Sequence, residues 1–129
     1  MNQANAIQAN QLADLIDRYF AMWNETNAER RRELIARTWT DTATYLDPVL
    51  QGDGRDGIDA MVKAVQERFP GHTFRLKGPV DSHHDRVRFS WDLASETGAP
   101  VVSGIDFGVV AEGQRLQTIT GFLDTMPGA

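Results

Sequence analysis

The stretch RVRFSWDLASETGAPVVSGIDFGVVA, residues 86–111, decides the fold, because it reads as two long strands joined by a turn. Successive side chains of a strand point to opposite faces, so each strand divides into two rows. The first strand alternates between an apolar row and a polar row: Val87, Phe89, Trp91 and Leu93, against Arg86, Arg88, Ser90 and Asp92. The turn Glu96-Thr97-Gly98 is a hairpin signal. We therefore predict an antiparallel pair in which the first strand has one apolar face, whereas both faces of the second are largely apolar.

Further strands are predicted on both sides of this pair. HTFRLKG (72–78) precedes it, and RLQTITGFLD (115–124) follows a second hairpin signal at Glu112-Gly113. Upstream, TATYLD (42–47) alternates and is β-prone, and it ends at an Asp-Pro pair. The segment QGDGRDG (51–57) is expected to be a loop.

Three helices are predicted in the first half of the chain. The first has apolar residues at three- and four-residue spacing: Leu12, Leu15, Ile16, Tyr19, Phe20 and Trp23. Thr26 and Glu29 resemble a capping box that opens the second helix. The third has one apolar stripe, ended by Pro70-Gly71, that consists of Ile58, Met61, Val62, Val65 and Phe69. Helices followed by antiparallel strands predict an α+β fold, with the helices on one face of a curved sheet.

Length and composition narrow the class of protein. The 129 residues fit a single domain over 1–129, with 1–7 as a loose N-terminal tail. There is no cysteine, and neither a secretion-signal layout nor an apolar run of membrane-spanning length is present, so a cytoplasmic location is expected. The net charge of −5 argues against nucleic-acid binding, and the basic cluster at 30–32 is interpreted as a solvated helix face.

Asp106 is the most informative polar residue, because it lies inside an apolar strand. It shares its face with two glycines, Gly104 and Gly108, which are expected to leave open space above the acid, and with Val102 and Val110. A largely apolar concave surface that holds a carboxyl group is typical of a small-molecule pocket. A buried carboxyl group can pair with a cation, accept hydrogen bonds or keep its proton. No Lys or Arg lies on its own strand face, so a neutral Asp106 is one open option, and a cation from another strand is the other.

Four stretches together resemble the ketosteroid isomerases of the nuclear-transport-factor-2-like, or SnoaL-like, superfamily. They are RYFAMWN (18–24), ATYLDPV (43–49), GRDGIDAM (54–61) and GIDF (104–107). The resemblance implies a cystatin-like, cone-shaped α+β barrel, in which three N-terminal helices pack in a strongly curved mixed or antiparallel sheet. It also implies a homodimer.

The resemblance also assigns roles. Asp47 matches the general base of the family, Tyr19 the tyrosine of its oxyanion hole, and Asp106 the protonated aspartic acid beside it. Asp47 would remove a proton α to a ketone, and Tyr19 and Asp106 would donate hydrogen bonds to the enolate. No cofactor or metal is implied. The expected ligand is a small hydrophobic carbonyl compound, in a pocket lined by Trp23, Tyr45, Met61, Phe89, Trp91 and Phe122.

Other functions stay open, because the superfamily includes cyclases, hydrolases and binding proteins. One alternative is a non-catalytic small-molecule binder or accessory protein, favoured if Asp106 pairs with Arg86 or Arg88. Another is a polyketide-cyclase or hydrolase type of enzyme in which Asp106 is the base. Asp47 could also be a simple turn former, and Tyr19 a core residue.

Two further features bear on the class of chemistry. Arg88 is expected on the opposite strand face from the aromatic row, which disfavours an epoxide-hydrolase arrangement with an arginine between two acids. His83 and His84 are neighbours in a predicted strand, so their rings are expected to face opposite ways and no metal site is predicted. One of them could still reach the pocket rim as a proton carrier.

Overall fold

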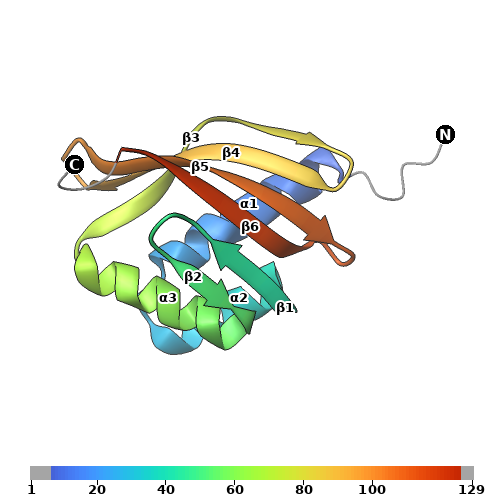
Figure 1. Cartoon of the computed structure of the whole chain (residues 1–129), viewed down its shortest axis with the longest axis horizontal. Coiled ribbons are helices and arrows are strands. Elements are labelled where there is room, and N and C mark those ends of the chain that lie inside the picture. Colours follow the sequence, from blue (N-terminus) through green and yellow to red (C-terminus); the bar gives the residue numbers. More distant parts are fainter. Residues whose placement is uncertain (1–6, 126–129) are drawn as a thin grey trace.

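The computed structural model describes residues 7–125, which form three helices and six strands (Figure 1). The helices are α1 (Ala9–Asn24), α2 (Ala28–Thr38) and α3 (Gly54–Arg68). The strands are β1 (Trp39–Leu46), β2 (Gln51–Asp53), β3 (His72–His83), β4 (Arg86–Ser95), β5 (Pro100–Ala111) and β6 (Arg115–Thr125). The predicted α+β class is confirmed. The expected loop at 51–57 is wrong, since it contains β2 and the first turn of α3.

The N-terminal tail expected over 1–7 lies outside the described residues except for Ile7, which packs partly buried against the core. The second helix does not begin at the predicted Thr26 cap. Its N-cap is Asn27, whose side-chain oxygen accepts a hydrogen bond from the Arg30 backbone N–H at 2.9 Å. Asparagine has the short polar side chain that satisfies such a free amide, so the cap moves one residue along the chain.

The six strands form one mixed sheet in the order β2-β1-β6-β5-β4-β3. Only β1 and β6 pair in parallel, and the predicted antiparallel pairing of β4 with β5 is confirmed. Register shifts in four of the five pairings mark irregularities at which strands bend. In Figure 1 the sheet arches over α1. On β5, Asp106 lies opposite Phe89 of β4 and Gly121 of β6, in the middle of the sheet.

The expected barrel is corrected to an open sheet. A closed barrel requires the two edge strands to pair, but β2 and β3 lie at opposite ends of the strand order. The β2 strand has only three residues, and the chain leaves it directly for α3. Most side chains of β3 are exposed. The sheet therefore curves around the helices without closing.

The helices lie on the inner side of the sheet, where α1 contacts β3 and α3 contacts β1 and β2 (Figure 1). The buried stripe of α1 consists of Leu15, Ile16, Tyr19, Met22 and Trp23. This stripe places Tyr19 and Trp23 beneath the sheet, and Tyr19 packs edge-on against Phe89 at 5.3 Å between ring centroids.

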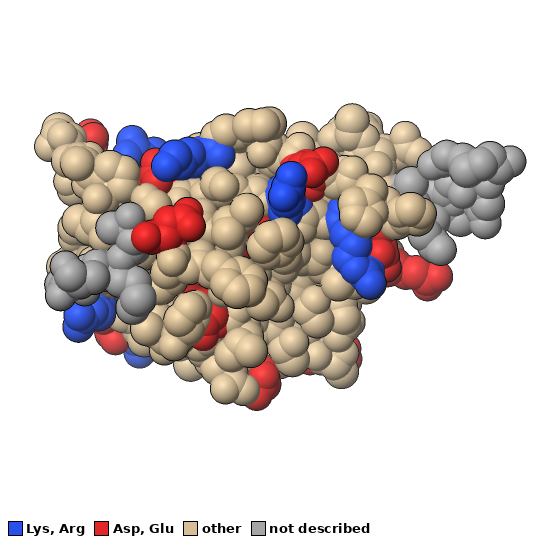
Figure 2. Space-filling view, turned by 45° about the horizontal axis from the view of Figure 1, so that its top comes forward, with Lys and Arg blue, Asp and Glu red and all other residues tan. Residues whose placement is uncertain are grey.

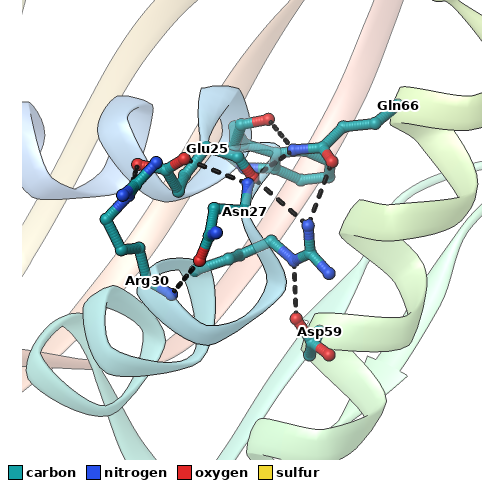
Figure 3. Close-up of polar contacts among 7 residues, drawn as sticks. Glu25, Asn27, Arg30, Asp59 and Gln66 are labelled. Carbon is teal, nitrogen blue, oxygen red and sulfur yellow. Dashed lines mark hydrogen bonds and ion pairs between the residues drawn. The ribbon is translucent and has the colours of Figure 1, made fainter.

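A buried polar network joins the three helices near the end of α1 (Figure 3). Arg31 of α2 is 2% exposed, and its Nε donates to Asp59 Oδ1 of α3 at 2.6 Å. Its Nη1 donates to Gln66 Oε1 at 3.1 Å and to the Glu25 carbonyl at 3.2 Å. The Gln66 amide in turn donates to the carbonyls of Trp23 and Glu25, both at 2.9 Å. Carbonyls at a helix C-terminus have no partner within the helix, so this network caps α1 and holds it on α3.

The interpretation of residues 30–32 as a solvated face is therefore wrong at Arg31. Its neighbours Arg30 and Arg32 are exposed, but Arg31 lies on the side of α2 that meets α3. A guanidinium group is buried at acceptable cost when a carboxylate and further acceptors surround it.

The outer face of the sheet exposes two aromatic rings, Phe107 and Phe122, which meet edge-on at 5.9 Å. Figure 2 turns the top of Figure 1 toward the viewer and shows Lys and Arg scattered among acidic residues over the described part of this face, without a continuous basic stripe. The homodimer and the cytoplasmic location stay predictions. Within residues 7–125, no helix combines the length and the apolar character needed to cross a membrane.

Candidate functional site

A cavity of about 390 Å³ lies between the helices and the inner face of the sheet. It exists because the core is divided into a main cluster and a smaller one of Trp91, Leu93 and Val102. Three phenylalanine rings pack against both clusters and line the cavity: Phe20, Phe69 and Phe74. The remaining lining residues are Tyr19, Trp23, Tyr45, Asp47, Val49, Leu50, Ala64, Val65, Arg68, Asp106 and Leu123.

The three predicted catalytic residues meet at this cavity, although they come from distant parts of the chain. Tyr19 lies on α1, Asp47 directly follows β1, and Asp106 is in the middle of β5. The Tyr19 hydroxyl donates to Asp106 Oδ2 at 2.7 Å. The Tyr45 hydroxyl donates to Asp47 Oδ2 at 2.6 Å. The cavity, whose lining is mostly apolar, thus contains two tyrosine–aspartate pairs.

Asp106 has the environment of a carboxyl group that keeps its proton. It is 2% exposed, and no cation among the described residues forms an ion pair with it. Arg86 pairs instead with Asp85, and Arg88 with Asp81. Burial raises the pKa of Asp106 to about 7 and the charge of Asp47 adds to the rise, while the Tyr19 hydroxyl and the Trp91 indole oppose it. A group with this pKa exchanges its proton near neutral pH.

One oxygen of Asp106 has no hydrogen-bond partner among the described residues. Oδ2 accepts the Tyr19 hydroxyl, but Oδ1 is buried and has no hydrogen-bond partner among the described residues. The pKa of Tyr19 is raised well above its usual value, mainly by burial and secondly by the charge of Asp106. Burial likewise raises the pKa of Tyr45. Both phenols therefore stay protonated donors at neutral pH.

Asp47 combines a turn-forming role with a place in the cavity. Its Oδ1 accepts hydrogen bonds from the backbone N–H groups of Val49 and Leu50, each at 2.8 Å. Its Oδ2 accepts the Tyr45 hydroxyl. Three donors stabilise the negative charge of this carboxylate. The two acids thus differ, since Asp47 accepts three hydrogen bonds whereas Asp106 is buried with one oxygen unpaired.

Gly121 of β6 allows these groups to approach one another. A Cβ atom at this position would lie 2.8 Å from Asp106 Oδ1, 3.2 Å from Asp47 Cβ and 3.4 Å from the Tyr45 hydroxyl. Any side chain there would displace at least one of them. Sequence reasoning missed Gly121, because a glycine in a strand carries no side-chain signal of its own.

Only some of the residues that were predicted to line the pocket do so. Trp23, Tyr45 and Trp91 line the cavity. Met61 and Phe89 are not among the lining residues and belong to the packed main cluster. Phe122 is 54% exposed on the outer face. The cause is strand alternation, since the preceding residue, Gly121, lies on the inner face opposite Asp106.

The expectation of open space above the two glycines of β5 is also wrong. A Cβ atom on Gly104 would lie 2.7 Å from Trp91 Cζ2, and one on Gly108 would lie 2.9 Å from Ile119 Cδ1. These glycines make room for neighbouring side chains. Leu93 and Val102 of the lining could have been found by strand alternation from Trp91 and Asp106, whereas Arg68 carries no such signal in the sequence.

The two histidines do not face opposite ways. Their Nδ1 atoms lie 3.1 Å apart, because His84 is beyond the end of β3 in a turn with φ 50°, where strand alternation no longer applies. They are not among the residues that line the cavity. Within the described part of the chain, no group of three or more His, Cys, Asp or Glu side chains is arranged to hold a metal ion. The predicted placement of Arg88 outside the aromatic row is confirmed, since it pairs with Asp81 on the surface.

Comparisons with known proteins agree with this architecture. A search of the curated proteins finds no match. Among solved structures, a candidate ketosteroid isomerase from Kribbella flavida DSM 17836 is 18% identical, with a TM-score of 0.66 over 93% of this chain and 82% of its own. A candidate SnoaL-like polyketide cyclase from Jannaschia sp. CCS1 is 17% identical, with a TM-score of 0.68 over 89% of this chain and 86% of its own. At these identities the likeness shows a shared fold.

Two comparisons go further than fold. A candidate isomerase of the SnoaL-like family from Agrobacterium tumefaciens strain C58 is 40% identical, with a TM-score of 0.84 over 89% of this chain and 98% of its own. The family model of the SnoaL-like domain matches residues 16–117, which is most of the chain. The predicted family resemblance is confirmed: the chain belongs to the SnoaL-like family.

Proposed function

We propose that this protein is a cofactor-independent enzyme of the isomerase type. It removes a proton from the carbon next to the carbonyl group of a small hydrophobic compound and returns that proton to another carbon of the same molecule. One observation carries the proposal: the unpaired Oδ1 of buried Asp106 shares an apolar cavity with the carboxylate of Asp47. The 40% identical relative is itself a candidate isomerase, which agrees with this class of reaction.

The two acids have complementary roles in this reaction. Protonated Asp106 donates a hydrogen bond from Oδ1 to the carbonyl oxygen, while Tyr19 holds Oδ2. Asp47 takes the α-proton on Oδ2, the electrons of the broken C–H bond move onto the carbonyl oxygen, and an enolate forms. Asp47 then returns the proton to another carbon of the same skeleton. The reaction is redox-neutral and restores both acids. Tyr19, whose hydroxyl is bonded to Asp106, acts here as a positioning residue.

The test is proton exchange at carbon in D2O. Small apolar ketones such as α-tetralone are incubated with the protein, and loss of the α-proton signal is followed by NMR. Asp47→Asn is expected to lower the exchange rate by about a hundredfold or more, as is usual when a positioned base is removed. Asp81→Asn, at an exposed acid outside the cavity, is the matched control. A rate that Asp47→Asn leaves unchanged would contradict the proposal.

A second candidate is supported by the hydrogen bonding of Asp47. This carboxylate already accepts three hydrogen bonds, whereas Asp106 Oδ1 accepts none, so Asp106 could be the base of a cyclase or hydrolase type of reaction. The pH profile separates the two. If neutral Asp106 is the donor, the rate falls as pH rises through its pKa of about 7. If ionised Asp106 is the base, the rate rises over the same range and Asp106→Asn is the more damaging variant.

A further inference from the structure

We infer that the indole N–H of Trp91 is a second hydrogen-bond donor for the substrate oxygen, beside the carboxyl group of Asp106. This inference rests on the proposed function and adds to it a residue whose donating group is otherwise unused. With two donors on one oxygen, the site would bind an enolate or a phenolate in preference to a ligand of the same shape without that oxygen.

The first support is an unpaired donor in the right place. Trp91 is 5% exposed and lines the cavity. Its buried Nε1 makes no hydrogen bond of good geometry with the described residues, although it lies near enough to Asp106 to oppose the rise in the pKa of that acid. Buried polar groups in proteins are nearly always paired, because leaving one unpaired costs stability. Asp106 Oδ1 is unpaired in the same cavity. A ligand oxygen held between the two would satisfy both groups at once.

The second support is the way in which the sheet holds the indole in place. Trp91 of β4 is paired with Gly104 of β5, two residues before Asp106 on the same face. Because Gly104 has no side chain, the indole lies directly against β5, where a Cβ atom would come within 2.7 Å of it. Phe74 packs edge-on against its other side, at 5.3 Å between ring centroids. A donor held from both sides needs no rearrangement when negative charge develops on the substrate.

Trp39 provides a matched comparison within the same chain. Its Nε1 is also buried and unpaired among the described residues, and the residue is fully buried. Trp39 does not line the cavity, so no ligand bound there would meet its N–H group. Substituting either tryptophan by phenylalanine makes the same chemical change, but only the substitution at Trp91 removes the donor of a residue that lines the cavity.

The experiment uses 4-nitrophenol as an oxyanion probe and 4-nitrotoluene as a ligand of similar shape without the hydroxyl. Both are titrated at pH 7 into the wild-type protein and into Trp91→Phe, Trp39→Phe and Asp106→Asn. We expect Trp91→Phe to weaken 4-nitrophenol binding about tenfold, which is typical of losing a hydrogen bond to a charged group, and to change 4-nitrotoluene binding less than about twofold. Trp39→Phe is expected to change neither.

A second readout does not depend on the stability of a variant. In 15N-labelled wild-type protein, the indole N–H signal of Trp91 should move downfield when 4-nitrophenol binds, and that of Trp39 should stay in place. An unmoved Trp91 signal, or equal weakening of both ligands by Trp91→Phe, overturns the inference. If Asp106→Asn alone weakens 4-nitrophenol, only the role of Trp91 fails. If no variant matters, or the wild type does not bind the probe, the proposed function fails with it.

Discussion

Replacing Asp106 by asparagine should stabilise the protein at alkaline pH. Asparagine keeps the size of the side chain and an oxygen that can accept the Tyr19 hydroxyl, but it cannot ionise. In the wild type, the buried carboxyl group must give up its proton in a cavity that does not solvate the charge. The substitution removes that cost, and the gain should build up over the pH range in which the acid is ionised in the unfolded chain but still protonated in the folded protein.

The magnitude follows from the pKa. An ordinary aspartate has a value of 3.8 and Asp106 a value of about 7, so at 1.36 kcal/mol per pH unit the difference corresponds to about 4 kcal/mol. The folded state binds this proton more tightly than the unfolded state. This group therefore lowers the free energy of unfolding by about 1.4 kcal/mol for each pH unit between pH 4 and pH 7. Above pH 7 the loss levels off.

The assay is urea unfolding of both proteins between pH 4 and pH 9, followed by tryptophan fluorescence. All other titrating groups are common to the two proteins, so the difference between their unfolding free energies isolates Asp106. We expect this difference to move in favour of Asp106→Asn by about 4 kcal/mol across the range. Asp81→Asn, at an exposed ion pair, should give a nearly flat difference. A flat difference for Asp106→Asn would refute the reasoning, because the carboxyl group would then be ionised throughout.

Two further predictions concern packing around the site. Gly121→Ala should cost about 1–3 kcal/mol of stability and abolish α-proton exchange, because the added methyl group would lie 2.8 Å from Asp106 Oδ1. Full activity in this variant would contradict the geometry. Asp59→Asn should cost about 3 kcal/mol in urea unfolding, because it leaves buried Arg31 without its counter-ion. Arg30→Gln, which breaks an exposed pair, should cost less than about 1 kcal/mol, and equal losses would contradict the assignment.

Local patterns predicted much of the fold. The alternation along β4 identified its buried row. Both faces of β5 are largely apolar, so its sequence predicted that Asp106 is shielded but not which face meets the helices. The apolar stripes of α1 and α3 identified the helix faces that meet the sheet. These predictions succeeded because an amphipathic period of two or of 3.6 residues has only one way to bury its apolar side. The family resemblance then placed Tyr19 and Asp47 beside Asp106, which periodicity alone could not do.

Features that depend on distant partners escaped prediction. Arg31 lies in the same charged segment as the exposed Arg30 and Arg32, so the sequence does not distinguish it from them. Only the approach of Asp59 and Gln66 on α3 makes its burial tolerable. The pairing of Trp91 with Gly104 was hidden, because the register between two strands is a tertiary property. The open edges of the sheet depend on the short β2, whose chain turns directly into α3.

The amino-acid sequence by itself determined the class of fold, the apolar row of β4 and the presence of an acid inside the apolar strand β5. These are consequences of side-chain period and polarity, which act over a few neighbouring residues. Only the tertiary structure decided that the two acids approach each other across Gly121, that their tyrosine partners differ, and that the core leaves a cavity between its two clusters. Ionisation and ligand access depend on what surrounds a group in space, and segments far apart along the chain supply those surroundings.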